Sequence, residues 1–264
     1  MNDIIGMEHA EIILIPLCFL TATISGVLGM AGGIIFMGGL LMIYPPVEAF
    51  FIHSLIQFVS NFQRFLQLRN YALFRPMFAY SLGALLVTLL LQKLHFRPQA
   101  HFTYFALSVI ALIPSYKNFP KPNFVKFFTA FQSGLLVHGT QILCGVAGPV
   151  LDLFFRNATL SRFHVIANKA LSQSVSHGLR IILFGGLLST SAKSQLNEDF
   201  FEKLPLPMSV LVPAILATFA GTFFSRKLLE KLSEKSFYKI TLHTLQVLAV
   251  FYLWQGLNLV LPAL

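Results

Sequence analysis

Apolar stretches alternate with short polar ones along the whole chain. Between Ile12 and Tyr44 there is no Asp, Glu, Lys or Arg, and similar gaps recur further on. Because a membrane-spanning helix needs about 20 predominantly apolar residues, this pattern predicts membrane spans. We expect apolar segments at residues 12–44, 47–68, 76–92 and 100–116 in the first half of the chain, and at 125–151, 161–188, 207–225 and 237–261 in the second.

The composition supports a membrane protein and excludes a water-soluble one. Of the 264 residues, 56% are hydrophobic and 11% are charged, whereas about a quarter of a soluble domain is charged. The net charge of +9 comes from basic residues in short clusters between apolar segments, which is typical of cytoplasmic loops and not of a nucleic-acid partner. The leader Met1–Glu11 has three acidic residues and no Lys or Arg, so we expect no signal peptide.

An internal repeat divides the chain into two related halves, at about residues 1–120 and 121–264. A shift of 116 residues aligns the glycine motif Gly29–Gly33 with Gly145–Pro149. The same shift aligns identical residues in the next apolar segment: Leu55 with Leu171, Gln57 with Gln173, Val59 with Val175, Ser60 with Ser176 and Arg64 with Arg180. Internal repeats of this kind are common in transporters.

The first segment of each half is too long for one straight span. Residues 12–44 would form a helix of about 50 Å, against a hydrocarbon core of about 30 Å. The glycine motif lies near its middle, and glycine is a poor helix former that turns easily. We therefore expect each first segment to be a hairpin of two short helices with the glycine motif at its tip. A new helix should begin near Gly33 and near Val150.

The basic residues of the loops favour these hairpins over straight spans. If both hairpins return to their starting side and the N-terminus is outside, the inside loops hold twelve basic residues. The outside loops then hold only Lys93, Arg97, Lys193 and Lys203. Eight straight spans would divide the same residues seven against nine, which leaves no positive-inside signal. The predicted fold is therefore an all-α polytopic membrane protein of two inverted repeats, each a glycine-tipped hairpin followed by three transmembrane helices.

The hairpin tips are the first candidate for a binding site. The amide groups that open the helix after each tip lack partners and carry the positive end of the helix dipole, which suits oxyanions. Glycine allows a ligand to approach such amides closely. The alternative is that these small residues only let helices pack closely. The candidate residues at the two tips are Gly29, Ala31, Gly32, Gly33, Gly145, Ala147 and Gly148.

A polar stripe on the following helix of each half is the second candidate. It comprises His53, Gln57, Asn61 and Arg64 in the first half, and Lys169, Gln173, His177 and Arg180 in the second. Their helical spacing places them on one face. The stripe holds cations and hydrogen-bond donors but no carboxylate, which favours an anionic substrate over a cation.

Three of these assignments have alternatives. Arg64 and Arg180 are as compatible with snorkelling to the interface as with lining a pathway. The histidines His53 and His177 are candidates for proton coupling, the alternative being hydrogen bonding between helices. Asp152, the one carboxylate near a hairpin, lies close to Arg156 in sequence, and we expect an ion pair between them on the cytoplasmic side.

The stretch from Ser25 to Gly33, its counterpart Gly145–Pro149 and the basic loop after the second segment resemble the TauE/SafE sulfite-exporter-like permeases. The resemblance covers nearly the whole chain. It implies a multi-pass transporter of the bacterial cytoplasmic membrane that exports or takes up sulfur-containing anions such as sulfite and organosulfonates. It also implies that the two glycine motifs face the substrate. Ala31 and Ala147 interrupt the unbroken glycines that are usual in the family.

Together these observations predict a secondary transporter for a small sulfur-containing anion bound between the hairpin tips. The resemblance to the family implies that the transport is export. A carrier of another small anion, such as a carboxylate or metal oxyanion, stays open. So do the coupling ion and the choice between monomer and homodimer. A membrane-embedded enzyme should show a Ser-His pair, HExxH or facing carboxylates, and the sequence has none of these. A scaffold would not need a duplicated polar stripe.

Catalytic metal chemistry is not expected either. The two cysteines, Cys18 and Cys144, lie in separate apolar stretches without CxxC spacing. We therefore expect buried thiols and no metal, cofactor or disulfide framework.

Overall fold

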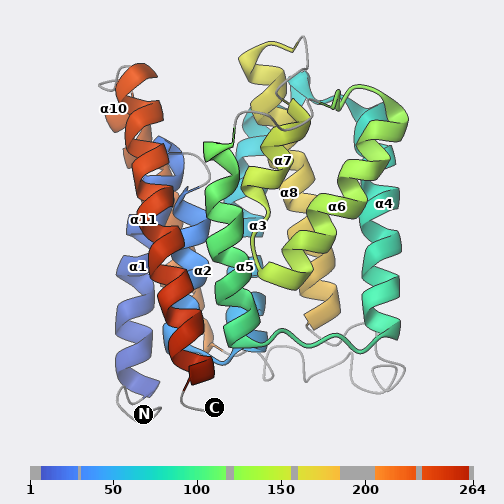
Figure 1. Ribbon diagram of the computed structural model, residues 1–264. Coiled ribbons are helices and arrows are strands. Elements are labelled where there is room, and N and C mark those ends of the chain that lie inside the picture. Colours follow the sequence, from blue (N-terminus) through green and yellow to red (C-terminus); the bar gives the residue numbers. More distant parts are fainter. Residues whose placement is uncertain are drawn as a thin grey trace.

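The computed structural model describes residues 7–28, 31–116, 122–155, 160–184, 206–229 and 234–261, and these form ten α-helices (Figure 1). The first half of the chain provides α1 (Met7–Leu28), α2 (Ala31–Ile43), α3 (Pro46–Leu68), α4 (Phe74–Lys93) and α5 (Ala100–Leu112). The second half provides α6 (Phe127–Cys144), α7 (Gly148–Phe155), α8 (Arg162–Phe184), α10 (Met208–Leu229) and α11 (Glu234–Val260). Short 3-10 turns follow α3 at Arg69–Tyr71 and α5 at Ile113–Ser115.

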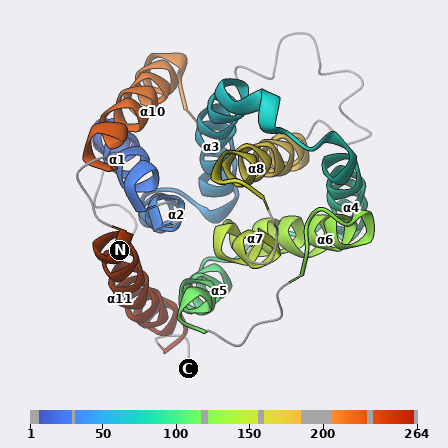
Figure 2. The ribbon, with the colours of Figure 1, turned by 90° about the horizontal axis from the view of Figure 1, so that it is seen from above.

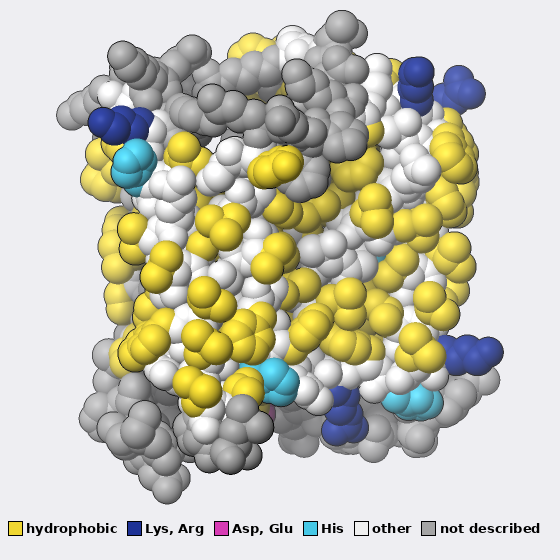
Figure 3. Space-filling view, viewed as in Figure 1, with side chains coloured by type: hydrophobic (Ala, Val, Ile, Leu, Met, Phe, Trp, Pro, Cys, Tyr) yellow, Lys and Arg dark blue, Asp and Glu magenta, His cyan; other side chains and the backbone are white. Residues whose placement is uncertain are grey.

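The surface of the helix bundle is that of a membrane protein. Large hydrophobic side chains are exposed on its outer helices, among them Leu86, Phe223 and Val250, which are 53%, 72% and 70% exposed. Figure 3 shows hydrophobic side chains over the middle of one face, with Lys and Arg only near its upper and lower rims. Three helical stretches are long and apolar enough to span a membrane by themselves: Phe74–Lys93, Met208–Ser225 and Lys239–Val260. The chain is therefore a multi-pass membrane protein.

Helices from opposite halves of the chain pair with one another. The closest pairs are α1 with α10, α4 with α6, α3 with α8, and α5 with α11. Seen from above, α2 and α7 lie toward the inside of the bundle, next to α3 and α8 (Figure 2). Small residues allow these close approaches, because a Cβ at Gly134 of α6 would overlap the Tyr80 carbonyl oxygen of α4. The interior is thus built from both halves, with α3 and α8 at its centre.

The helix breaks at the glycine motifs are confirmed. The first helix ends at Leu28 and α2 begins at Ala31, while α6 ends at Cys144 and α7 begins at Gly148. The new helices thus begin two residues earlier than we expected. Gly145, at the end of α6, has φ +83°, and its N–H donates to the Gln141 carbonyl at 2.9 Å. A left-handed residue in this position ends a helix, and glycine adopts it without strain.

The prediction of two short helices in each hairpin is wrong for the first one. With 22 residues, α1 is about 33 Å long, although its apolar stretch Ile13–Val27 is shorter than a full span. It stays continuous because it packs along α10 through small residues. A Cβ at Gly221 of α10 would overlap the Phe19 carbonyl oxygen, and one at Gly26 of α1 would overlap the Ser225 side chain. The second hairpin matches the prediction better, since α7 has only 8 residues.

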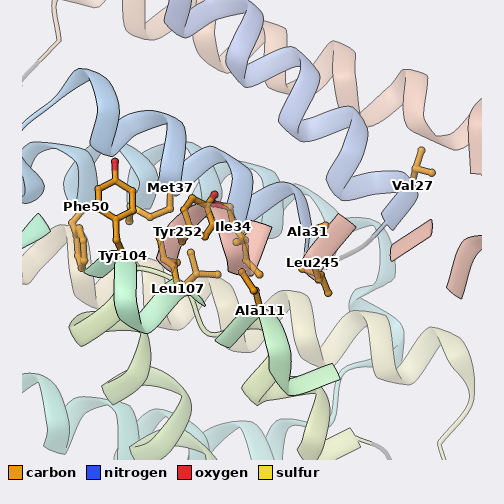
Figure 4. Packing of buried hydrophobic residues seen from close by; sticks show 12 residues of the cluster. Val27, Ala31, Ile34, Met37, Phe50, Tyr104, Leu107, Ala111, Leu245 and Tyr252 are labelled. Carbon is orange, nitrogen blue, oxygen red and sulfur yellow. The ribbon is translucent and has the colours of Figure 1, made fainter. Parts of the chain in front are cut away.

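A buried apolar cluster holds α2 in place. Ile34 and Met37 of α2 pack with Tyr104 of α5 and with Leu245 and Tyr252 of α11 (Figure 4). The Tyr252 hydroxyl donates to the Ile34 carbonyl oxygen at 2.8 Å. The phenol can approach because residue 38 is glycine, where a Cβ would overlap the Tyr252 ring. The helix that follows the first glycine motif is therefore fixed by α5 and α11.

Candidate functional site

The candidate site lies where α3 and α8 cross at the centre of the bundle (Figure 2). The two helices run antiparallel, because Phe50 of α3 contacts Arg180 of α8 while His53 faces His177. The ring centroids of the two histidines are 5.5 Å apart. Both histidines are 2% exposed. The structure therefore brings together residues of the two polar stripes that the sequence predicted separately.

Arg180 is the buried charge of this site. Its side chain is fully buried, so it does not snorkel to the interface. Its NH1 group donates to the Gly145 carbonyl oxygen at 2.6 Å, and NH2 donates to the Phe50 carbonyl oxygen at 2.9 Å. The guanidinium carbon also lies 5.0 Å from the centroid of the Phe50 ring, within range of a cation–π interaction. Arg180 thus links α8 to the second glycine motif and to the start of α3.

Glutamine and histidine side chains continue the site toward the first glycine motif. The His53 Nε2 group donates to the Gly33 carbonyl oxygen at 3.2 Å. Gln141 of α6 places its amide nitrogen 2.9 Å from Nε2 of His177 and donates to Oε1 of Gln173 at 3.3 Å. We name these four side chains, together with Gln57 and Arg180, the central cluster: His53, Gln57, Gln141, Gln173, His177 and Arg180.

Several polar atoms of the central cluster are buried without a hydrogen-bond partner. They are His53 Nδ1, Gln141 Oε1, Gln173 Nε2 and Arg180 Nε. A buried polar group without a partner costs free energy, and such groups cluster where a ligand or ordered water completes the network. Because His53 donates from Nε2, its Nδ1 is an acceptor in the neutral ring. The cluster therefore offers a ligand both donors and a basic nitrogen.

The predicted tip residues have different surroundings. A Cβ at Gly32 would overlap the Thr21 carbonyl oxygen and the Ser25 side chain of α1, so this glycine serves close packing. At Gly33 a Cβ would have one neighbour within 4 Å, Nε2 of Gln57 at 4.0 Å. Gly33 therefore faces the central cluster with space beside it. Ala31 is buried at the start of α2, and Gly29 lies outside the residues that the structure describes.

The second tip also combines a turn with a contact to the cluster. Gly145 makes the left-handed turn and accepts from Arg180, and a Cβ there would overlap the Met37 side chain of α2. Ala147 accepts the first α7 hydrogen bond, from Leu151 N at 2.9 Å, and Gly148 is the first residue of α7. Pro149 has no N–H, so α7 offers fewer free amides than α2 does.

Three predicted residues lie at the edge of the central cluster. Asn61 donates to the Gln57 carbonyl oxygen of its own helix at 2.8 Å and lies 3.5 Å from the Gln57 side-chain oxygen. Arg64 is partly exposed one turn before the end of α3. Lys169 forms an ion pair with Asp152 of α7. We had expected Asp152 to pair with Arg156, which lies outside the described residues.

Gln141 and His138 of α6 were not among the predicted site residues. Both are fully buried, and His138 Nε2 lies 2.8 Å from the Thr88 hydroxyl of α4. The sequence does offer a reason to select Gln141, because it is a polar residue in an apolar run, about one helical turn before Gly145. Its counterpart after the shift of 116 residues is Ser25, so no shared identity pointed to it. Among the described residues, no group of three or more His, Cys, Asp or Glu side chains could hold a metal ion.

The fold and the central cluster define a multi-pass membrane protein with a buried, positively charged polar site between its two halves. The chain belongs to the TauE/SafE sulfite exporter family, whose model matches residues 14–252. It is therefore a membrane transport protein. Comparison with curated proteins gave no match, and comparison with solved structures gave none either.

Proposed function

We propose that this chain is a secondary transporter that exports a small sulfur-containing anion, such as sulfite or an organosulfonate, across a bacterial cytoplasmic membrane. The observation that carries the proposal is the buried Arg180, which lies among unpartnered polar atoms of the central cluster. A buried guanidinium is stabilised by a negative partner, and among the described residues the polar contacts of Arg180 are two carbonyl oxygens. The family supports a sulfur-containing anion as that partner.

The anion is bound between the two glycine motifs. Amides at the start of α2, near Gly33, have no acceptor within their own helix. The amide of Gln173 and the Nε group of Arg180 add donors without partners. A sulfonate or sulfite offers three oxygens as acceptors. Charge-assisted hydrogen bonds of this kind are about twice as strong as neutral ones.

Alternating access requires that the two halves, residues 1–120 and 121–264, have opposite orientations in the membrane. The helix pairs support this relation, because α1 packs on α10 and its counterpart α6 packs on α4. The equivalent helices α3 and α8 run antiparallel, as halves of opposite orientation require. Arg180 ties the second hairpin to α3 through Gly145 and Phe50. An anion that binds the guanidinium of Arg180 would replace these hydrogen bonds and let the second hairpin move relative to α3.

Export is coupled to a proton at the histidine pair. His53 Nδ1 is buried and unpartnered, and its ring stands 5.5 Å from that of His177. A proton accepted there would add a positive charge next to the anion, whose negative charge would offset the repulsion between that proton and Arg180. The two rings would hold one proton in preference to two, because like charges at this distance repel.

Flux through reconstituted vesicles tests the proposal. The full chain should move radiolabelled sulfite or methanesulfonate down a gradient. Gln57→Ala combined with Gln173→Ala should slow the initial rate by about 10- to 100-fold, since two hydrogen bonds of about 1–1.5 kcal/mol each are lost. The matched control is Gln67→Ala combined with Gln132→Ala, which changes two exposed glutamines on α3 and α6. Normal flux in the first double variant would overturn the site, and no flux of any anion in the unmodified protein would overturn the function.

A further inference from the structure

The two halves of the chain hold different pairs of side chains at equivalent positions. In the first half, Phe36 of α2 stacks on His53 of α3, with ring centroids 5.5 Å apart. The shift of 116 residues that relates the halves converts this pair into Asp152 of α7 and Lys169 of α8. These two side chains form an ion pair and are 23% and 30% exposed. A neutral, buried pair in one half thus corresponds to a compensated pair of charges in the other.

Because of this difference between the halves, the central cluster has a single positive charge without a carboxylate partner. The positive charge of Lys169 is neutralised by the carboxylate of Asp152. The residue of the first half that aligns with Lys169 is His53, which carries no charge in its neutral form. Arg64 is partly exposed and lies seven residues beyond Gln57, near the end of α3. Among the described residues, Arg180 is then the only buried charge facing the cluster without a carboxylate partner.

We propose that the site selects anions of a single negative charge, and that Asp152 sets this selectivity by neutralising Lys169. The inference rests on the proposed function and specifies the substrate class of the same site. A monovalent anion beside Arg180 gives a buried pair with no net charge. A dianion leaves one negative charge without compensation, which is strongly unfavourable in a buried site. Lys169 lies one helical turn before Gln173 on α8, on the same face of the helix, so once released from Asp152 it would supply the second positive charge.

The experiment compares a permanent monoanion with a permanent dianion of similar size in the reconstituted full chain. Methanesulfonate and sulfate serve as these probes, at about pH 8, where a histidine with its ordinary pKa of about 6.5 is neutral. The unmodified protein should carry methanesulfonate at least about tenfold faster than sulfate, which corresponds to about 1.4 kcal/mol. In Asp152→Asn the ratio of sulfate to methanesulfonate rates should rise about tenfold or more.

Two further variants separate charge from structure. Asp152→Asn combined with Lys169→Met removes both charges and should restore the original preference for methanesulfonate. Glu48→Gln removes an exposed carboxylate near the start of α3 and should leave the ratio unchanged. If Asp152→Asn does not fold, Lys169→Met alone supplies the test, because the freed Asp152 carboxylate should slow methanesulfonate as well as sulfate.

The outcomes distinguish this inference from the proposed function. Equal transport of both probes by the unmodified protein would overturn the selectivity while leaving an anion transporter. An unchanged ratio in a folded Asp152→Asn variant would overturn the role of Asp152. Failure of the unmodified protein to move sulfite, methanesulfonate or sulfate would overturn the proposed function itself.

Discussion

Neighbouring glycines of the first motif serve different purposes. Gly32 is in contact with the backbone of α1, where the Thr21 carbonyl oxygen leaves no room for a Cβ. Gly33, one residue later, turns toward α3 and has Gln57 as its one neighbour within 4 Å of a Cβ. The sequence left open whether such glycines allow close helix packing or give a ligand access to the backbone. In this motif the first explanation applies to Gly32 and the second to Gly33.

Alanine substitutions should separate the two roles. Gly32→Ala forces α1 and α2 apart and should lower the free energy of unfolding by about 1–3 kcal/mol. Gly33→Ala should fold normally but reduce anion flux by about fivefold, since a methyl group beside Gln57 weakens a bound anion by about 1 kcal/mol. Thermal unfolding in detergent and flux in vesicles measure the two effects. Equal losses of stability in both variants would contradict the distinction.

The helices themselves could be predicted well from the sequence, because their boundaries depend on local residues. Pro46 starts α3, and the glycine motifs interrupt the first segment of each half. The length of α1 could not be predicted, since it depends on contacts with α10 through Gly26 and Gly221. Likewise, the shared face of His53, Gln57 and Asn61 on α3 follows from helical spacing, but the Asp152–Lys169 pair depends on a contact between α7 and α8.

A polar side chain connects elements at the end of the bundle as well. Asn168 of α8 is fully buried. Its Nδ2 donates to the Tyr71 carbonyl oxygen at 3.1 Å, and its Oδ1 accepts from Leu73 N at 2.9 Å. These bonds fix the 3-10 turn Arg69–Tyr71 between α3 and α4. One side chain of the second half therefore satisfies the backbone of a turn in the first half.

Asn168→Ala should destabilise the fold by about 1–3 kcal/mol, because buried backbone groups of the turn lose their partners. Asn70→Ala, which changes an exposed side chain in the same turn, is the control and should unfold at the temperature of the unmodified protein. Helical circular dichroism during heating in detergent measures both. Coinciding unfolding curves for the two variants would show that Asn168 does not hold the turn.

At the scale of the whole molecule, the Lys and Arg side chains visible on the surface in Figure 3 lie near the two ends of the bundle. The start of α1 and the end of α11 lie at the lower end in Figure 1, and the turn between α3 and α4 lies at the upper end. That turn carries Arg69 and Arg75, and the loop after α4 at the opposite end carries Lys93 and Arg97. The excess of basic residues in the predicted inside loops predicts that the upper end is cytoplasmic. The orientation is therefore a consequence of loop charge that can be measured directly.

Cysteine labelling should place Asn70 in the cytoplasm and Gln99 outside. Both side chains are exposed, one before α4 and one after it, while the native Cys18 and Cys144 are buried and should label weakly. In sealed right-side-out vesicles, a membrane-impermeant maleimide should label Gln99→Cys at once and Asn70→Cys only after permeabilisation. The reversed pattern would contradict the orientation. Labelling of both from the same side would contradict the crossing of α4, and with it the three spans that follow the first hairpin.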